Sequence, residues 1–153
     1  MSELKRILLV EDNANDVDLT LAALAETRLA NEVVVVRDGQ EALDYLQRRG
    51  AWATRPVAHP AVVLLDLKLP RLDGTQVLAQ IKGDPELRTI PIVMLTSSRE
   101  ERDLASSYGL GVNAYVVKPV VFADFVRALK DLGLFWGVLN QPPPGSLPPS
   151  AGR

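Results

Sequence analysis

The feature that most constrains the fold of this chain is a series of short apolar runs, each followed directly by a polar residue. Four runs span residues 7–10, 61–65, 91–95 and 114–117, and a valine-rich fifth run spans residues 32–36. Short continuous apolar runs are typical of strands buried on both faces of a sheet. The chain is therefore expected to contain five such strands.

Amphipathic stretches lie between these runs. We expect helices at about residues 16–27, 39–49, 75–82, 99–108 and 122–132, and in the first of them Val17, Leu21 and Leu24 recur at helical spacing. Asn13 or Asn15 could cap that first helix. Strands that alternate with helices predict βαβ units, so the sequence predicts an α/β fold with an open, five-stranded parallel sheet.

Polar side chains stand at the ends of four predicted strands. They are Glu11, Asp12, Asp66, Thr96 and Lys118. In an open α/β sheet, ligands bind outside the carboxyl ends of the strands, so these side chains should gather on one edge. Any one acidic residue at a strand end could be an ordinary solvated loop residue. The whole set at four strand ends indicates a functional site instead.

The residue types in this set suit a divalent metal and a phosphoryl group. Magnesium prefers carboxylates, water and phosphate oxygens, which Glu11, Asp12 and Asp66 could complement. An aspartate can also act as a nucleophile and form an aspartyl phosphate. Lys118 would then supply a cation and Thr96 a hydroxyl donor to the charge that develops on the phosphoryl oxygens.

Composition excludes several other classes. A net charge of −2 and a pI of about 5.4 argue against a nucleic-acid-binding module, which usually carries a basic excess. No apolar run approaches the roughly 18 residues that a membrane span needs, and the N-terminal run is too short for a signal peptide. The chain has no cysteine, which excludes disulfides and thiol chemistry. We expect a cytoplasmic protein.

Other residues in the sequence carry weaker signals. Pro119 follows the last strand directly, and a cis bond before it would aim Lys118 into the site. Tyr115 could be a partly buried sheet aromatic or a ring that changes rotamer when Thr96 moves. His59 has no neighbouring acid or lysine that would mark a phosphohistidine site. Trp52 is interpreted as an anchor of a longer loop at residues 50–60.

The C-terminal residues differ in character from the rest. Residues 134–139 are mostly apolar, and residues 140–153 contain five prolines. The second stretch is typical of a polyproline-like or disordered tail. We therefore expect one domain at residues 1–133 and an extension at residues 134–153.

The motifs together resemble the receiver domain of two-component response regulators, over about residues 5–132. They are Leu-Val-Glu-Asp-Asn at 9–13, Leu-Leu-Asp-Leu-Lys-Leu-Pro at 64–70, Asp73-Gly74, Leu-Thr-Ser at 95–97 and Lys118-Pro119. The numbers of residues that separate Asp12, Asp66, Thr96 and Lys118 also agree with the spacing in that family. The resemblance implies a doubly wound, flavodoxin-like (CheY-like) (βα)5 fold.

The resemblance also implies roles for individual residues. Asp66 would accept a phosphoryl group from a histidine kinase, so the protein would be a phosphoacceptor rather than an enzyme. Magnesium would be held by Glu11, Asp12, Asp66 and the backbone carbonyl of Lys68. Thr96 would be the switch hydroxyl, Tyr115 the switch aromatic and Lys118 the phosphate-binding lysine.

The chain is similar, more narrowly, to stand-alone regulators that pair with phytochrome-type photoreceptor kinases. The features are the loop at 50–60, the turn at 69–74, residues 111–115 and Phe135-Trp136. This resemblance implies a phytochrome kinase as partner. We also expect a homodimer, because residues 134–139 would expose an apolar patch of the kind that marks an interface, and the resemblance favours it. The dimer would form through the helix at 99–108, the strand at 114–117, the helix at 122–132 and residues 134–139; alternatively, residues 134–139 fold back on their own subunit. No DNA-binding domain is recognisable after the last helix, so we expect the output to be a protein contact.

Three alternative functions fit these residues less well. A magnesium-dependent aspartyl-phosphate hydrolase usually carries a second aspartate two residues after its nucleophile, whereas Leu67 and Lys68 follow Asp66 here. A degenerate receiver that acts only as a binding module would lack some of the site residues, and all are present. A nucleotide-binding Rossmann domain would need a Gly-x-Gly-x-x-Gly motif, which is missing.

Overall fold

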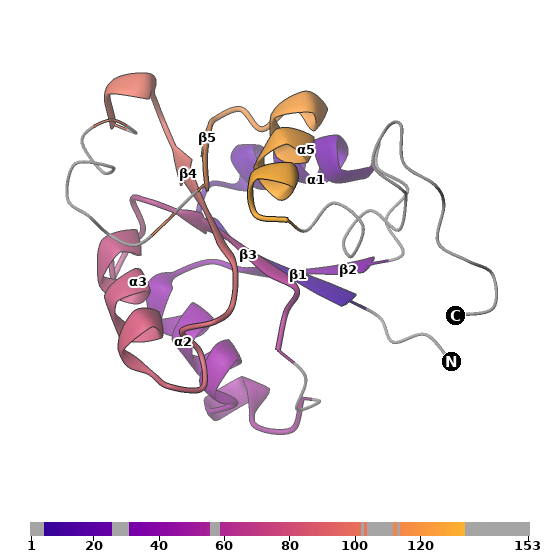
Figure 1. Cartoon of the computed structure of the whole chain (residues 1–153). Coiled ribbons are helices and arrows are strands. Elements are labelled where there is room, and N and C mark those ends of the chain that lie inside the picture. Colours follow the sequence, from indigo (N-terminus) through magenta and orange to yellow (C-terminus); the bar gives the residue numbers. More distant parts are fainter. Residues whose placement is uncertain are drawn as a thin grey trace, which may run out of the picture.

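The computed structural model describes residues 5–25, 31–55, 59–101, 103, 112 and 114–133. They form a five-stranded parallel sheet with the strand order β2-β1-β3-β4-β5 (Figure 1). The strands are β1 (Lys5–Val10), β2 (Asn31–Val36), β3 (Val62–Asp66), β4 (Ile92–Thr96) and β5 (Ala114–Val117). This order confirms the predicted CheY-like α/β fold.

Helices cover both faces of the sheet. They are α1 (Ala14–Ala25), α2 (Gly39–Gln47), α3 (Gly74–Gly83) and α5 (Phe122–Asp131). In Figure 1, α1 and α5 lie on one face and α2 and α3 on the other, so the sheet is doubly wound. Of the helix predicted at 99–108, residues 99–101 and 103 are helical, and the remainder lies outside the described residues.

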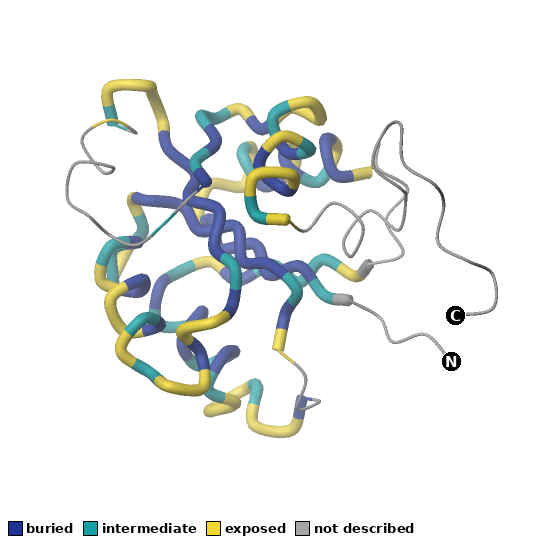
Figure 2. The backbone as a smooth tube through the Cα atoms, in the orientation of Figure 1, coloured by how far each residue is buried: buried dark blue, intermediate teal, exposed yellow. Residues whose placement is uncertain are grey.

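The sheet is the centre of the core because its middle strands are buried on both faces (Figure 2). Every residue of β3 is buried, as the continuous apolar run predicted. Successive side chains of a strand point to opposite faces. Accordingly Ile7 and Leu9 pack with α1 and α5, whereas Leu8 and Val10 pack with α2 and α3. The strands are therefore buried on one face by α1 and α5 and on the other by α2 and α3.

Local hydrogen bonds set the helix ends. The Asn13 side chain accepts a hydrogen bond from the Asp16 backbone N–H at 2.9 Å, so Asn13 rather than Asn15 caps α1, which begins at Ala14, two residues earlier than predicted. The helix predicted to reach residue 49 ends at Gln47. There Arg48 adopts a left-handed conformation with φ of 57°, and its N–H donates to the Asp44 and Tyr45 carbonyls.

The stretch predicted as a loop at residues 50–60 contains a short 3₁₀-helix, η1 (Gly50–Trp52). Trp52 meets the Tyr45 ring edge-on, with centroids 4.9 Å apart, which confirms its predicted anchoring role. The Arg55 guanidinium lies 4.2 Å from the centroid of the same Tyr45 ring and donates to the Tyr45 and Leu46 carbonyls. These contacts hold the segment that contains Trp52 and Arg55 against the C-terminal end of α2.

Gly74 places the first turn of α3 against the end of β3. Its N–H donates to the Leu67 carbonyl at 2.9 Å. A Cβ at this position would collide with the Asp66 carbonyl and lie 2.7 Å from the Leu67 carbonyl. Only glycine permits this approach of the helix to the strand end, so Gly74 helps to fix the backbone on which Asp66 is carried.

The C-terminal predictions fall outside the described residues. They comprise the apolar stretch at 134–139 and the proline-rich tail. Within the part of the chain that is described, no helix has both the length and the apolar character that crossing a bilayer requires.

Candidate functional site

The sheet brings the predicted site residues together at its carboxyl edge. Glu11 follows β1, Asp66 ends β3, Thr96 ends β4 and Lys118 follows β5. Backbone hydrogen bonds continue past the strand ends and fix their register. The Glu11 N–H donates to the Val36 carbonyl at 3.0 Å, and the Lys118 N–H donates to the Thr96 carbonyl at 2.7 Å. The predicted convergence on one edge is therefore a consequence of parallel pairing.

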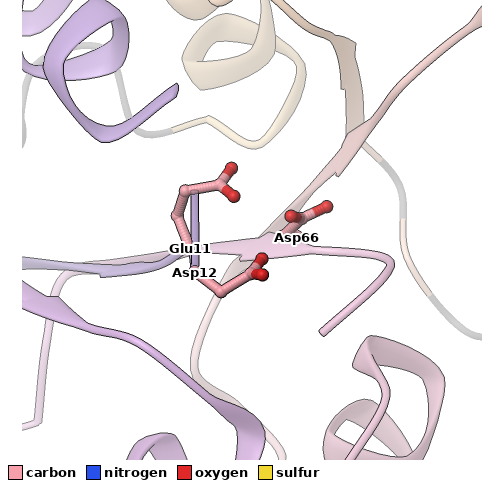
Figure 3. Close-up of side chains that lie close together, drawn as sticks. All are labelled: Glu11, Asp12 and Asp66. Carbon is pink, nitrogen blue, oxygen red and sulfur yellow. The ribbon is translucent and has the colours of Figure 1, made fainter. Parts of the chain in front are cut away.

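Three carboxylates form the centre of the site, and we call them the acid triad (Figure 3). Oxygen atoms of Glu11, Asp12 and Asp66 all lie within 4.8 Å of one another. Glu11 is fully buried and Asp66 is 3% exposed, whereas Asp12 is exposed. Oxygen donors that are clustered, negatively charged and open to solvent on one side fit a hard divalent cation.

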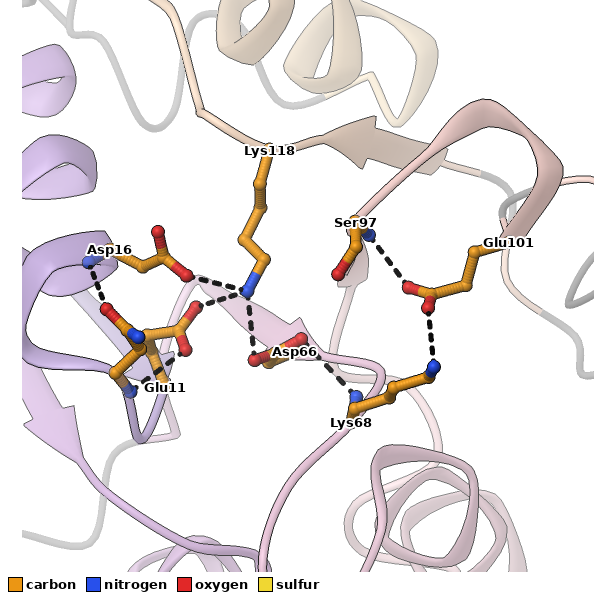
Figure 4. A network of polar contacts seen from close by, with 8 residues as sticks. Glu11, Asp16, Asp66, Lys68, Ser97, Glu101 and Lys118 are labelled. Carbon is orange, nitrogen blue, oxygen red and sulfur yellow. Dashed lines mark hydrogen bonds and ion pairs between the residues drawn. The ribbon is translucent and has the colours of Figure 1, made fainter.

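Lys118 is the hub of a polar network beside the triad (Figure 4). Its Nζ lies 3.1 Å from Glu11 Oε1, 3.0 Å from Asp16 Oδ2 and 3.2 Å from Asp66 Oδ2. The side chain is 13% exposed, so these are partly desolvated ion pairs. The Lys118–Pro119 peptide bond is cis, as the sequence predicted.

Burial and charge together perturb both partners of the Asp66–Lys118 pair. Burial, reinforced by the hydrogen bond and the negative charge of Glu11, raises the pKa of Asp66 from 3.8 to about 7, although Lys118 opposes this shift. Burial alone would lower the pKa of Lys118, but the hydrogen bond to Asp16 and the charges of Asp66 and Glu11 outweigh it and raise that pKa. Asp66 is thus poised to change its protonation near neutral pH, while Lys118 stays charged.

Thr96 contributes a hydroxyl that has no hydrogen-bond partner among the described residues. The side chain is fully buried at the end of β4, and the Thr96 carbonyl is the one that holds the Lys118 backbone. A buried hydroxyl without a partner is unfavourable in this state, and a ligand that accepts its hydrogen bond would remove that cost. Thr96 therefore fits a site that binds an oxygen-rich group.

Lys68 connects the acid triad to the segment after β4. Its N–H donates to Asp66 Oδ1 at 3.3 Å, and its Nζ pairs with Glu101 Oε2 at 3.2 Å. The other Glu101 oxygen accepts a hydrogen bond from the Ser97 N–H at 2.7 Å. This network ties the loop after Asp66 to the residue that follows Thr96 (Figure 4).

Two members of these networks, Asp16 and Glu101, were not predicted as site residues. Asp16 carries a signal, because it is an acidic residue at the start of the predicted first helix, close in sequence to the strand end that carries Asp12. Glu101 also carries one, since it stands three residues after Ser98, whose hydroxyl accepts the Glu101 N–H at 3.1 Å. Neither signal distinguishes a site residue from an ordinary residue of a first helical turn.

The remaining sequence candidates lie apart from the acid triad. Tyr115 is partly buried on β5 and packs against the core layer on the α2 and α3 side, which agrees with a partly buried sheet aromatic. His59 is exposed near the end of α2, beside Arg48 and Arg49, and contacts no member of the triad network.

A doubly wound parallel sheet with clustered carboxylates and a lysine at its carboxyl edge has the architecture of a signal receiver domain. The family model for the response regulator receiver domain matches residues 7–130. The chain therefore belongs to the response-regulator receiver family, and it is a response regulator of two-component signalling.

Individual relatives agree with this assignment. Response regulator Rcp1 of Synechocystis sp. is 40% identical over 132 residues, which cover 86% of this chain and 88% of that protein. Bacteriophytochrome response regulator AtBRR is 63% identical with a TM-score of 0.86, covering 92% of this chain and 100% of that chain. Bacteriophytochrome response regulator RtBRR is 61% identical with a TM-score of 0.85, covering 94% of this chain and 87% of that chain.

Two further solved structures bear on the chemistry of the site. One is the phosphorylated cyanobacterial phytochrome response regulator RcpA, 41% identical with a TM-score of 0.71, covering 97% of this chain and 100% of that chain. The other is the Mn²⁺-bound form of Rcp1, 38% identical with a TM-score of 0.69, covering 95% of this chain and 99% of that chain. Similar proteins thus accept a phosphoryl group and a divalent cation.

Proposed function

We propose that Asp66 is the phosphoacceptor of this response regulator and that Mg²⁺ is its metal. The observation that carries the proposal is that Asp66 ends the middle strand of the sheet, belongs to the acid triad and lies 3.2 Å from Lys118 Nζ. Glu11 also contacts Lys118, but it is fully buried and is held through its second oxygen by the Asn13 N–H at 3.2 Å. Asp12 is exposed and has no contact with the lysine among the described atoms.

The side chains suggest how transfer proceeds. A carboxylate oxygen of Asp66 attacks the phosphorus, the P–N bond to the donor histidine breaks, and the bonding electrons leave with the imidazole nitrogen. Lys118 donates to a phosphoryl oxygen, and the free Thr96 hydroxyl donates to another. A cation held by Glu11, Asp12, Asp66 and the Lys68 carbonyl would offset negative charge on the phosphoryl group.

Phosphorylation by a small-molecule donor tests this assignment. The wild type, Asp66→Asn and Asp18→Asn are incubated with acetyl phosphate and Mg²⁺, and the added phosphate mass is measured on intact protein. Asp18 is an exposed carboxylate on α1 and serves as the control. The wild type and Asp18→Asn should gain one phosphoryl group and Asp66→Asn none. A modified Asp66→Asn protein would refute the assignment.

We further propose that the phosphoryl donor is a phytochrome-type histidine kinase. The support is the similarity to regulators whose names associate them with bacteriophytochromes or phytochromes, at 61–63% identity for two of them. An autophosphorylated phytochrome kinase should transfer its label to the wild type within seconds to minutes and leave Asp66→Asn unlabelled. Faster transfer from an unrelated kinase would contradict this partner while leaving the role of Asp66 intact.

Homodimerisation through β5, α5 and the flanking residues 99–108 and 134–139 is also proposed. On the described part of this face, one pocket is lined by Tyr115 together with the charged residues Arg99, Asp124, Arg127 and Asp131. Charges of both signs on one patch suit a two-fold interface, in which the same patch meets itself. Sedimentation of the wild type and of a chain ending at Gly133, which retains the proposed receiver unit 1–133, tests it. A wild type that stays monomeric with and without phosphodonor would exclude the dimer.

A further inference from the structure

Asp16 is the member of the Lys118 network that the proposed phosphoryl chemistry does not use. It lies in the first turn of α1, and its Oδ2 accepts a hydrogen bond from Lys118 Nζ at 3.0 Å. This is the shortest of the three Lys118 contacts recorded among the described residues. Asp16 is outside the acid triad, so a cation held by the triad does not account for its presence.

The three contacts use all the hydrogen-bonding capacity of Lys118. An ammonium group has three N–H donors, and Glu11, Asp16 and Asp66 each accept one (Figure 4). The side chain is only 13% exposed, so water offers it few alternative partners. A phosphoryl oxygen can therefore gain an N–H from Lys118 only when one carboxylate gives up its own.

The three carboxylates differ in what else would bind them. Glu11 and Asp66 belong to the acid triad, and Asp66 would itself be esterified. The Asp16 side chain has Lys118 as its partner and keeps 28% of its surface exposed, so its charge is not costly to maintain. Its backbone is fixed as well, because the Asp16 N–H donates to the Asn13 cap at 2.9 Å.

We propose that Asp16 is a positioning residue for Lys118. It holds the ammonium at the carboxyl edge of the sheet when Glu11 and Asp66 turn to a divalent cation and a phosphoryl group. One N–H of Lys118 then changes its acceptor from Asp66 to a phosphoryl oxygen, while Asp16 continues to hold the ammonium group on the α1 side. This inference rests on the proposed role of Asp66 as phosphoacceptor.

Three variants separate anchoring from charge. Asp16→Ala removes both the acceptor and the charge, whereas Asp16→Asn keeps an acceptor oxygen and should restore much of the anchoring. Asp18→Ala removes one negative charge from an exposed position of the same helix and is the matched control. If Asp16→Ala does not fold, Asp16→Ser replaces it, because serine suits a first helical turn but is too short to reach Lys118.

The measurement is binding of beryllofluoride, a phosphoryl analogue, by titration calorimetry at saturating Mg²⁺, with Mg²⁺ alone titrated separately. Asp16→Ala should weaken beryllofluoride binding about tenfold, the size expected for loss of one hydrogen bond between charged groups. Asp16→Asn should weaken it by roughly threefold or less and Asp18→Ala not at all. The Mg²⁺ affinity should change by less than about threefold in every variant, because Asp16 is outside the triad.

A spectroscopic readout reports the anchoring itself. The Lys118 ammonium should give a resolved ¹H–¹⁵N signal in the beryllofluoride complex of the wild type, and this signal should be lost to exchange with water in Asp16→Ala. Wild-type affinity for beryllofluoride in Asp16→Ala would overturn the proposal, and so would equal losses of Mg²⁺ and beryllofluoride affinity. A wild type that binds no beryllofluoride would instead refute the proposed function.

Discussion

At the scale of single residues, the site combines groups whose burial is unfavourable in the unphosphorylated protein. Asp66 is nearly buried beside Glu11, and the hydroxyl of Thr96 is buried without a described partner. Both features cost stability in this state, and the proposed binding of a cation and a phosphoryl group would relieve both. Substitutions at Asp66 and Thr96 should therefore stabilise the fold while they impair the function.

Asp66→Asn should stabilise the unphosphorylated protein at neutral and alkaline pH without divalent cations. Burial beside Glu11 raises the pKa of Asp66 from 3.8 to about 7, so between these values the folded state binds more protons than the unfolded state. The wild type then loses stability from this group as pH rises from about 4 to about 7, by up to roughly 4 kcal/mol at about 1.4 kcal/mol for each pKa unit.

Urea unfolding at pH 4.5 and pH 8 measures this difference. The free energy of unfolding of Asp66→Asn should exceed that of the wild type more at pH 8 than at pH 4.5, because the carboxylate is largely protonated in the folded wild type at the lower pH. Asp18→Asn, which alters an exposed carboxylate, should show no such pH-dependent gain. A gain of equal size at both pH values would argue against a raised pKa at Asp66.

Thr96→Val should separate stability from switching. Valine has nearly the same shape and removes a buried hydroxyl that has no partner among the described residues. The free energy of unfolding should therefore stay within about 1 kcal/mol of the wild type or rise. The phosphorylated form, in contrast, should lose the hydroxyl contact to the phosphoryl group. We expect acetyl phosphate still to phosphorylate Thr96→Val, more slowly than the wild type, with much smaller changes in the amide NMR signals of β4 and β5 than in the wild type. A large loss of stability would show that the hydroxyl already has a partner.

At the scale of the elements, the sequence predicted strands better than helix ends. The strands were predictable because β1, β3, β4 and β5 each contain a continuous apolar run, and such runs have few alternatives in a chain of alternating elements. The end of α2 was not predictable, because it depends on the left-handed backbone of Arg48. Arginine, unlike glycine or asparagine, gives no sequence signal for that conformation.

The acid triad was predictable for a similar reason. Glu11 and Asp12 come directly after β1, and Asp66 is the last residue of β3. Parallel pairing of these strands alone therefore places the three side chains together. Asp16 and Glu101 reach the site through side-chain length and helix geometry. Their contacts, to Lys118 and Lys68 respectively, join residues far apart in the chain and depend on how the helices pack. No local pattern encodes that packing.

Gly74→Ala should damage both the fold and the site. The new Cβ would collide with the Asp66 carbonyl, so α3 must move away from the end of β3, at a cost of roughly 1–3 kcal/mol. Phosphorylation should slow as well, because the same backbone carries the Asp66 side chain. Gly83→Ala is the matched control, since a Cβ there meets no atom within 4 Å and should leave the protein as stable or slightly more so.

Thermal unfolding and the rate of acetyl phosphate labelling, measured on both variants, test this role. If Gly74→Ala and Gly83→Ala behave alike, the close approach of α3 to β3 has no energetic consequence. A Gly74→Ala protein that is destabilised but labelled at the wild-type rate would show that the position of Asp66 tolerates movement of α3.

At the scale of the whole molecule, one edge of the sheet concentrates charge that the rest of the fold must accommodate. Glu11, Asp16 and Asp66 each contact the ammonium group of Lys118, and Asp12 adds a further carboxylate to the acid triad. Removing this excess of negative charge should stabilise the entire domain, because a domain of this size typically unfolds as one unit. Divalent cations should therefore act on global stability as well as on phosphoryl transfer.

We expect Mg²⁺ or Mn²⁺ to raise the unfolding temperature in a pH-dependent way. A ligand that binds only the folded state stabilises it by about 2.7 kcal/mol at a concentration one hundred times its dissociation constant. Protons compete for the same carboxylates, and the pKa of Asp66 is raised to about 7, so the metal-induced shift should be larger at pH 8 than at pH 6. Calorimetric scans without metal and with a saturating metal concentration, on the order of 10 mM, provide the measurement. Asp12→Asn should lose most of the shift and Asp18→Asn should keep it; an equal shift in both would mean that the cation binds elsewhere on the surface.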